Sequence, residues 1–192
     1  MNVTHTSVRA QILAVLQAWG SPAHLAEVTA EVMVETDLMG VDSHGISMLM
    51  NYEEMLRAGQ LRISGEPRIA RDFAATALVD GADGLGHPAA VMAMKLAIEK
   101  ARAFGVGAVG VVNSHHFGAA GYYARLASSA GLIGLVTSST RGVLMVPTRA
   151  TEPVLGTNPI AFAAPAGPDH RPVVLDMATT TVAGNKVKVY HL

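Results

Sequence analysis

Apolar side chains recur at spacings of three and four through the first part of the chain, the period of a helix with one buried face. Gly20 and Gly59 each end such a stretch, and Ser21-Pro22 offers a cap and a first-turn proline to the second of them. Residues 1–60 are therefore predicted to form a helical segment. Its helices are expected over residues 5–19, 22–38 and 46–58.

From residue 61 onward the apolar positions form short runs bounded by turn residues, which is typical of β-strands. Two more helices are predicted among these runs, over residues 89–104 and 122–130, each stopped by a glycine. Residues 61–192 should therefore form one compact mixed α/β core with strands buried on both faces. The strands are expected at residues 62–71, 76–80, a run ending at 112, 132–138, 160–163 and 173–175.

The composition favours a folded domain that acts on small molecules. Half of the 192 residues are apolar, which is ample for a core, and the formal net charge is −1, with 14 basic and 15 acidic residues. Such a balance creates no global field for nucleic acid or an anionic membrane. No apolar run reaches the ~20 residues of a spanning helix. The chain has no cysteine and begins without a secretion signal, so a cytoplasmic location is expected.

Two adjacent histidines form the first candidate site. His115 and His116 follow an apolar run that ends at Val112, and the small residues Gly118 and Ala119 come soon after. The imidazoles therefore lie at a strand end, in a loop whose backbone a ligand can approach closely. Because the unperturbed pKa of histidine is about 6.5, such a side chain can donate or accept a proton near neutral pH.

A further imidazole, that of His44, follows Asp42-Ser43 at the start of the third predicted helix. The positive end of the helix dipole favours neutral imidazole there, while Asp42 and Ser43 can equally be read as helix caps. Asp176 ends a late apolar strand and either orients an imidazole or caps a helix or turn. We expect the segments around His44, His116 and Asp176 to meet in one cleft.

Residues 105–110 match the spacing of the dinucleotide-binding fingerprint, but their context argues against that function. The fingerprint needs a strand before its glycines and a helix after them, because the pyrophosphate rests on the helix N-terminus. Here a helix ends at Gly105 and a strand follows. A nicotinamide or flavin cofactor would therefore bind without the usual Rossmann site.

Three other functions have weaker support. A zinc site at the adjacent histidines lacks nearby carboxylates or cysteines, and consecutive side chains diverge on a strand or loop. A serine nucleophile at Ser43 lacks a glycine-flanked elbow. A helix-turn-helix function is disfavoured because the second predicted helix carries three glutamates and neither lysine nor arginine to meet phosphate.

Four motifs, taken in order, resemble the malate/L-lactate dehydrogenase family outside the Rossmann group. That family includes ureidoglycolate, sulfolactate and related 2-hydroxy acid dehydrogenases and a cyclic imino acid reductase. The resemblance runs from about residue 5 to the end of the chain, and four ordered motifs are far more specific than any one of them. The motifs are residues 42–45, 113–122, 156–159 and 175–179.

The resemblance implies an α/β fold in which N-terminal helices pack with a mixed β-sheet of the non-Rossmann type. It also implies an oxidoreductase that uses NAD or NADP and interconverts a small 2-hydroxy acid and a 2-oxo acid, or reduces a cyclic imine. The nicotinamide would carry the hydride, and the protein would supply orientation and charge. A homodimer with the active site near the subunit contact is expected.

The resemblance also assigns expected roles to single residues. His116 or His44 would transfer the proton, and Ser43 and Asp176 would support His44 through hydrogen bonds. Substrate would be bordered by Met48, Tyr52, Thr157 and Asn158. The cofactor would be lined by His115, Phe117, Gly118, Ala119, Thr140, Leu175, Met177, Ala178 and Thr179.

Two departures from the family pattern support a rival function. Met48 stands where the family usually has an arginine that pairs with the substrate carboxylate, so the substrate would lack that group or bind it elsewhere. Family members are also much longer, so a complementing C-terminal chain is a further possible partner. The rival is a non-redox descendant, either a binding or scaffold protein or an acid–base enzyme that needs no cofactor.

Overall fold

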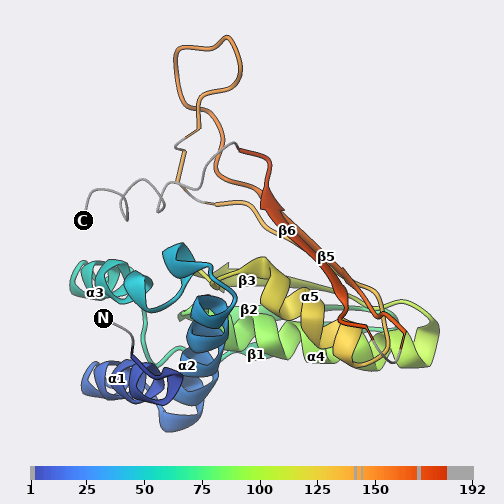
Figure 1. Cartoon of the computed structure of the whole chain (residues 1–192), viewed down its shortest axis with the longest axis horizontal. Coiled ribbons are helices and arrows are strands. Elements are labelled where there is room, and N and C mark those ends of the chain that lie inside the picture. Colours follow the sequence, from blue (N-terminus) through green and yellow to red (C-terminus); the bar gives the residue numbers. More distant parts are fainter. Residues whose placement is uncertain (1–2, 141, 144, 168–169, 181–192) are drawn as a thin grey trace. The chain divides into compact units, whose positions relative to one another are not determined.

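A division between Ala119 and Ala120 separates two units of the fold, Met1–Ala119 and Ala120–Leu192, which we call unit 1 and unit 2 and describe separately (Figure 1). The computed structural model describes residues 3–140, 142–143, 145–167 and 170–180. The predicted mixed α/β class is confirmed. The sequence placed its division at residue 60, where the hydrophobic period changes, whereas the N-terminal helices and the strands that follow them share unit 1.

Unit 1 begins with helices close to those that the apolar spacing predicts. Thr4 caps the first, because its hydroxyl accepts a 3.2 Å hydrogen bond from the Ser7 amide. Ser21 does not cap the second, since Pro22 occupies the cap position and makes no side-chain hydrogen bond there. The elements are α1 His5–Ala18, α2 Ala23–Leu38, η1 Asp42–His44, η2 Ile46–Met48 and α3 Leu49–Arg57.

The capping group for the third predicted helix comes from the end of α2. The Ile46 amide donates to Asp37 Oδ2 at 2.9 Å. Gly45 makes this contact possible, because a Cβ at that position would overlap the Asp37 carboxylate. Neither Asp42 nor Ser43 is used as a side-chain cap at the turns that begin this segment.

The apolar faces of these helices enclose one core. It also takes in residues from the segments that lead to and from the first sheet, so the helices depend on the rest of unit 1 for their stability. Burying each large aliphatic side chain contributes about 1.5–3 kcal/mol. The buried members are Ile12, Leu16, Ala26, Ala30, Met33, Val34, Met48, Tyr52, Leu61 and Leu85.

A β-α-β crossover completes unit 1. The sheet has the order β1-β2-β3, with β2 antiparallel to β1 and parallel to β3, and the long helix α4 connects the two parallel strands. Helix and sheet pack through Val79, Ala89 and Ala93. The bounds are β1 Arg68–Phe73, β2 Thr76–Gly84, α4 Gly86–Phe104 and β3 Ala108–Ser114.

Two boundaries in this crossover differ from the prediction. The first strand begins at Arg68, so residues 62–67 lie outside it. Helix α4 begins at Gly86, three residues before the predicted start at 89. Pro88 fits the first turn of α4, because the proline has no amide hydrogen and the first-turn amides have no partner within the helix.

Unit 2 consists of one helix on one face of a three-stranded antiparallel sheet with the order β4-β5-β6. Ala161 and Ala163 of the central strand are fully buried. Gly134 lies against Ala124, where a Cβ would be 2.5 Å from the helix carbonyl oxygen. The bounds are α5 Ala120–Ser129, β4 Gly134–Thr137, β5 Pro159–Ala164 and β6 Val173–Ala178.

The opposite face of the unit 2 sheet, which we call the outer face, is apolar and exposed. The strand register places Leu135, Phe162 and Leu175 side by side across the three strands. Leu135 and Leu175 are 63% and 49% exposed, and Val173 of the same face is 62% exposed. The expectation that these strands are buried on both faces is therefore wrong for unit 2, because helix α5 covers only one of them. It is also wrong for β1 and β3 of unit 1, whose residues are mostly exposed.

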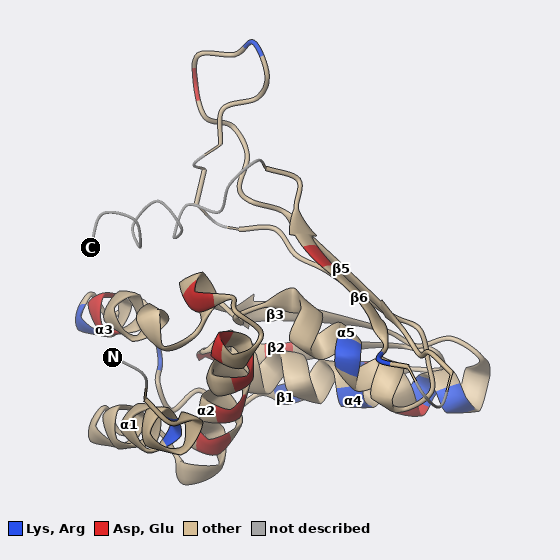
Figure 2. Ribbon diagram, viewed as in Figure 1, with Lys and Arg blue, Asp and Glu red and all other residues tan. Residues whose placement is uncertain are grey.

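The charge and hydropathy of the helices bear on DNA binding and on membrane insertion. Acidic residues lie along α2 (Figure 2), which supports the case against a DNA-reading helix. Within the described residues, every helix is too short or too polar to cross a bilayer.

Candidate active site

His44 and His116 come together inside unit 1, as the sequence predicted. His44 ends η1, and His116 lies in the loop after β3, 72 positions further along the chain. Their ring centroids are 5.3 Å apart, with the rings tilted by 33°. Two imidazoles from distant segments therefore lie within reach of one small ligand.

Ser43 is placed to control the ring of His44. Its side chain is buried, and its Oγ lies 2.8 Å from His44 Nδ1. This contact holds the imidazole in one orientation, with the direction of the hydrogen bond set by the tautomer of His44. The predicted hydrogen bond between Ser43 and His44 is thus present.

Two donors converge on Nδ1 of His116 and select its tautomer. The Gly118 amide donates to this nitrogen at 3.3 Å, and Tyr52 Oη lies 2.7 Å from it. An amide N–H can only donate, so Nδ1 accepts, and in the neutral ring the proton is on Nε2. Burial raises the pKa of Tyr52, which keeps its hydroxyl protonated and able to donate.

The surroundings keep His116 uncharged at neutral pH. Its pKa is lowered from 6.5 to about 3, first by burial and then by the neighbouring imidazoles of His44 and His87. The ring is therefore a neutral group with a hydrogen-bond donor at Nε2 rather than a permanent cation.

His87 is a third imidazole of this cluster and is not among the site residues predicted from the sequence. It belongs to the first turn of α4 and is completely buried. Its ring lies edge-on to Tyr52 and His116, at centroid distances of 5.9 and 6.4 Å. Burial lowers its pKa to about 3, so it too is neutral. In the sequence, a histidine before a proline at a predicted helix start indicates only that a helix begins there.

Backbone contacts with α4 fix the loop that carries His116. The Gly86 amide donates to the His116 carbonyl at 2.9 Å, and the His115 amide donates to the Gly84 carbonyl at 3.1 Å. A Cβ on Gly86 would lie 2.4 Å from the His115 carbonyl oxygen, so only glycine allows this approach.

The same contacts distinguish the N-terminus of α4 from the phosphate-binding turn of a Rossmann fold. The segment from β2 through α4 to β3 is a parallel β-α-β unit with glycines at its first turn, the usual place for a pyrophosphate. Here the helix N-terminus receives a carbonyl of the protein itself, that of His116. The expectation that a dinucleotide would need a different site agrees with this arrangement.

A register shift near the ends of β2 and β3 sets the direction of the two segments that follow these strands and carry histidines. The register between β2 and β3 shifts after Asp80, so that residues 81–83 oppose Asn113 alone. Ala82, Asp83 and Asn113 all have positive φ, of 52°, 55° and 49°. Such bulges bend a strand and redirect the residues that follow, which here are the loop to α4 and His115-His116.

The other predicted site residues of unit 1 are buried or half-buried. Met48 is buried, and its sulfur accepts a 3.6 Å hydrogen bond from Asn51 Nδ2. His115 Nε2 is buried without a hydrogen-bond partner among the described residues. Phe117 is half-buried, and Gly118 and Ala119 are buried.

The remaining predicted residues belong to unit 2. Asp176 accepts a 2.6 Å hydrogen bond from the Gly121 amide in the first turn of α5, as its helix-cap alternative proposed. Thr140 Oγ1 accepts from the Thr157 amide at 3.3 Å, and Asn158 Nδ2 donates to the Gly156 carbonyl at 3.0 Å.

The predicted cofactor strand of unit 2 is largely exposed. Leu175 and Met177 are on the outer face, where they are 49% and 51% exposed, and Ala178 and Thr179 follow. That any residue of unit 2 joins the histidine cluster, and that Asp176 supports His44, stay predictions.

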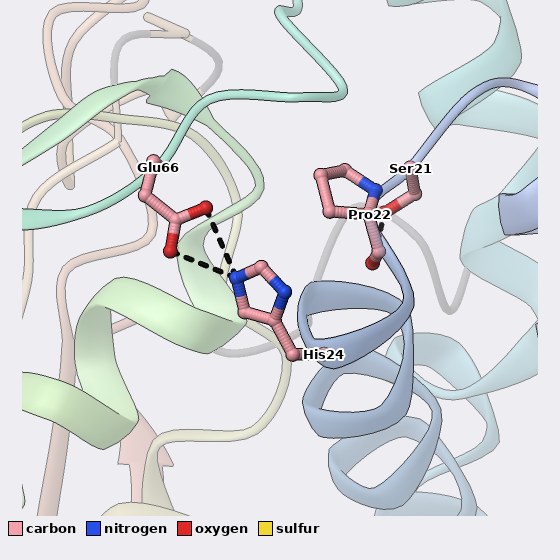
Figure 3. A network of polar contacts seen from close by, with 4 residues as sticks. All are labelled: Ser21, Pro22, His24 and Glu66. Atoms are coloured by element: carbon pink, nitrogen blue, oxygen red, sulfur yellow. Dashed lines mark hydrogen bonds and ion pairs between the residues drawn. The ribbon is translucent and has the colours of Figure 1, made fainter.

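A separate groove lies between α2 and α4 and contains none of the predicted site residues. At its rim His24 Nε2 is 2.8 and 3.0 Å from the two carboxylate oxygens of Glu66 (Figure 3). Its walls are mainly apolar, from Leu25, Val28, Val91 and Leu96 among others. Among the described residues, no group of three or more His, Asp or Glu side chains is placed to hold a metal ion.

Fold and site together define an α/β protein of the non-Rossmann kind, with neutral imidazoles clustered beside the N-terminus of its crossover helix. The profile of the family described as malate/L-lactate dehydrogenase matches residues 3–192. The chain belongs to the malate/L-lactate dehydrogenase family.

Individual relatives agree with this assignment. The chain is 42% identical to the malate dehydrogenase of Pyrococcus abyssi over 180 residues, which cover 94% of this chain and 49% of the relative. It is 41% identical to the L-sulfolactate dehydrogenase of Methanothermobacter thermautotrophicus over 173 residues, or 90% of this chain and 50% of the relative. The chain thus spans about half the length of these curated relatives.

Solved structures show the same fold. Malate dehydrogenase from Pyrococcus horikoshii OT3 superposes with a TM-score of 0.91 at 39% identity, covering 98% of this chain and 53% of that one. The Δ1-piperideine-2-carboxylate reductase of Pseudomonas syringae gives a TM-score of 0.87 at 32% identity, with 98% and 56% covered.

Proposed function

We propose that the protein is an NAD- or NADP-dependent oxidoreductase that interconverts a small 2-hydroxy acid and 2-oxo acid, or reduces a cyclic imine. The observation that carries this proposal is the partly buried pair His44–His116, with ring centroids 5.3 Å apart, in a fold whose relatives are named dehydrogenases. Hydride transfer to a carbonyl or imine requires a nearby group that supplies a proton, and imidazole meets this need near neutral pH.

The two histidines would have different roles. Nδ1 of His116 accepts hydrogen bonds and its pKa is about 3, so this ring would donate its Nε2–H to the substrate oxygen or nitrogen and polarise it. His44, oriented by Ser43, would then exchange the proton. Tyr52 would hold His116 in the donating tautomer rather than contact the reacting atoms.

The residues present fit a nicotinamide ring in one respect. His87 and His116 are uncharged at neutral pH and so place no positive charge beside the ring. When bound, the nicotinamide would supply or accept the hydride. His115, Phe117, Gly118 and Ala119 are the unit 1 residues proposed to line it, with Thr140 and residues 175–179 proposed from unit 2.

Fluorescence titration with NADH and NADPH tests the proposal. Binding should alter nicotinamide emission, and a panel of 2-oxo acids and cyclic imines should then oxidise the bound cofactor. The matched variants His44→Gln and His116→Gln should keep cofactor binding and lose turnover. Failure to bind either cofactor, by this chain alone and by the chain with a C-terminal half from a relative, would refute the proposal.

A second function is favoured by one residue. Met48 is buried in the helical core that also contains Tyr52, and it has no charge with which to pair a substrate carboxylate. A descendant that binds a ligand, or that catalyses acid–base chemistry without cofactor, would retain the imidazoles and dispense with that charge. Binding of a neutral carbonyl or imine ligand in the absence of nicotinamide, with no hydride transfer when NADH is added, would support this second function.

We also propose the partners and location. The exposed apolar outer face of unit 2 supports association with further polypeptide, either a second copy in a homodimer or a complementing C-terminal chain. Light scattering of the purified chain, alone and mixed with such a C-terminal half, distinguishes the two. A cytoplasmic location is proposed from the cysteine-free composition and can be checked by cell fractionation.

A further inference from the structure

His87 is a completely buried polar side chain that the proposed chemistry does not use. Neither Nδ1 nor Nε2 has a hydrogen-bond partner among the described residues. A polar group that is buried and unpaired lowers stability, and an aliphatic side chain would fill the same core without that penalty. The position of this imidazole is therefore the place to look for a function.

The ring of His87 contacts each group that defines the state of His116. It meets Tyr52 and His116 in T-shaped arrangements, both at interplanar angles of 77°. Its Nε2 is also close to Gly118, where an added Cβ would be 3.3 Å away. Tyr52 and Gly118 are the two donors to His116 Nδ1, so His87 lies beside both donors and the acceptor.

We propose that His87 is a positioning residue, whose imidazole holds Tyr52 and Gly118 against Nδ1 of His116 and so keeps the proton of His116 on Nε2. The inference rests on the proposed function for its catalytic meaning, since an Nε2–H on His116 is the group that would polarise the substrate. T-shaped ring pairs are directional and stabilise one relative orientation beyond the effect of buried area alone, so the edge of His87 favours fixed positions of both rings.

The direct measurement is the tautomer of His116, read from long-range proton–nitrogen correlations of the imidazoles in the ¹⁵N-labelled chain. The chain has eight histidines, so assignment uses single His→Gln variants. In the unmodified protein His116 should show the Nε2–H form and keep it between pH 8 and 5. His44, His87 and Tyr52 are the titratable groups that face it.

His87→Ala should release Tyr52 and Gly118. His116 should then show averaged tautomer shifts and begin to protonate within this pH range, as water enters the space. His87→Phe retains an aromatic ring edge and should preserve the Nε2–H form, which is the rescue expected of a positioning role. Circular dichroism and the thermal midpoint confirm that each variant is folded.

A purely structural role for His87 predicts a different result. The thermal midpoint of folded His87→Ala would fall while the tautomer and titration of His116 stayed as before, and this outcome would overturn the proposal. If His87→Ala does not fold, His87→Gln replaces it, with the same two outcomes. Neither measurement uses a cofactor, so a lack of NADH binding would contradict the proposed function and leave the positioning role intact.

Discussion

Units 1 and 2 differ in how far their apolar and polar side chains are buried. Unit 1 encloses a set of large aliphatic residues in a helical core and brings three imidazoles together, of which that of His87 is completely buried. Unit 2 covers one face of its sheet with α5 and leaves the other face exposed, with Leu135 63% and Val173 62% accessible. The contrast lies between the helical core of unit 1 and the sheet of unit 2, because β1 and β3 of unit 1 are also exposed along most of their length.

From this difference we infer that the histidine cluster of unit 1 is the site of chemistry and that the outer face of unit 2 is the surface for association. Burying polar imidazoles lowers stability unless the site gains something from them, so unit 1 is organised around the histidine cluster. An exposed apolar sheet face with unpaired edge strands is, in contrast, typical of a surface that other polypeptide covers. Predictions that separate the two units follow in order of expected effect.

Replacing the central imidazole should give the largest effect. His116→Ala removes the Nε2–H that would polarise the substrate, so turnover should fall by about 10²–10³-fold, the usual cost of losing such a donor, while the fold is retained. The measurement is NADH oxidation with the 2-oxo acid or imine that the ligand panel identifies. His24→Ala, which alters an exposed imidazole at the rim of the α2–α4 groove, is the matched control and should retain turnover. Unchanged turnover in His116→Ala would move the chemistry to His44 alone.

A core truncation in unit 1 comes next. Leu16→Ala, at a fully buried position of the helical core, should lower the free energy of unfolding by about 2–5 kcal/mol. Urea unfolding followed by fluorescence measures this directly, because Trp19 is the single tryptophan of the chain and packs against that core. A change below 0.5 kcal/mol would show that unit 1 is not the well-packed body described above.

The sequence predicted the helices, the mixed class and the convergence of His44 with His116. These follow from local periodicity and from polar residues placed at element ends. It did not predict that Asp37 caps the turn at Ile46, because that hydrogen bond depends on where α2 ends in space. Nor did it predict His87, whose burial depends on close packing against Gly118 from a distant segment.

The exposure of the unit 2 sheet was missed for a related reason. Alternation and apolar content predict that a strand has faces to bury, but they do not say what covers them. Val173 and Leu175 read as core residues in the sequence and are on the outer face in the structure. Tertiary context, rather than the local pattern, decides such positions.

The buried imidazoles should make unit 1 sensitive to acid. The pKa values of His87 and His116 fall from 6.5 in the unfolded chain to about 3 in the folded one, so the unfolded state binds more protons between these values. Stability should be fully present above pH 6.5 and decline as the pH falls towards 3, by at most about 1.4 kcal/mol per pH unit for each histidine. Urea unfolding at pH 7, 6, 5 and 4 measures the decline. His87→Gln should reduce its slope, and a flat profile in the unmodified chain would contradict the burial of both rings.

The smallest change in stability should come from the outer face of unit 2. Leu175→Ala removes apolar surface that is already 49% exposed, so the free energy of unfolding should change by no more than about 0.5 kcal/mol. Its effect should appear in association instead, because Leu175 lies beside Phe162 in the centre of the apolar patch. Light scattering across a concentration series should show weaker self-association, or weaker binding of a C-terminal half, than in the unmodified chain. Ala161→Gly, on the face that α5 covers, should show the reverse, with lower stability and unchanged association. Equal stability losses in both variants would mean that the outer face is buried within the chain itself.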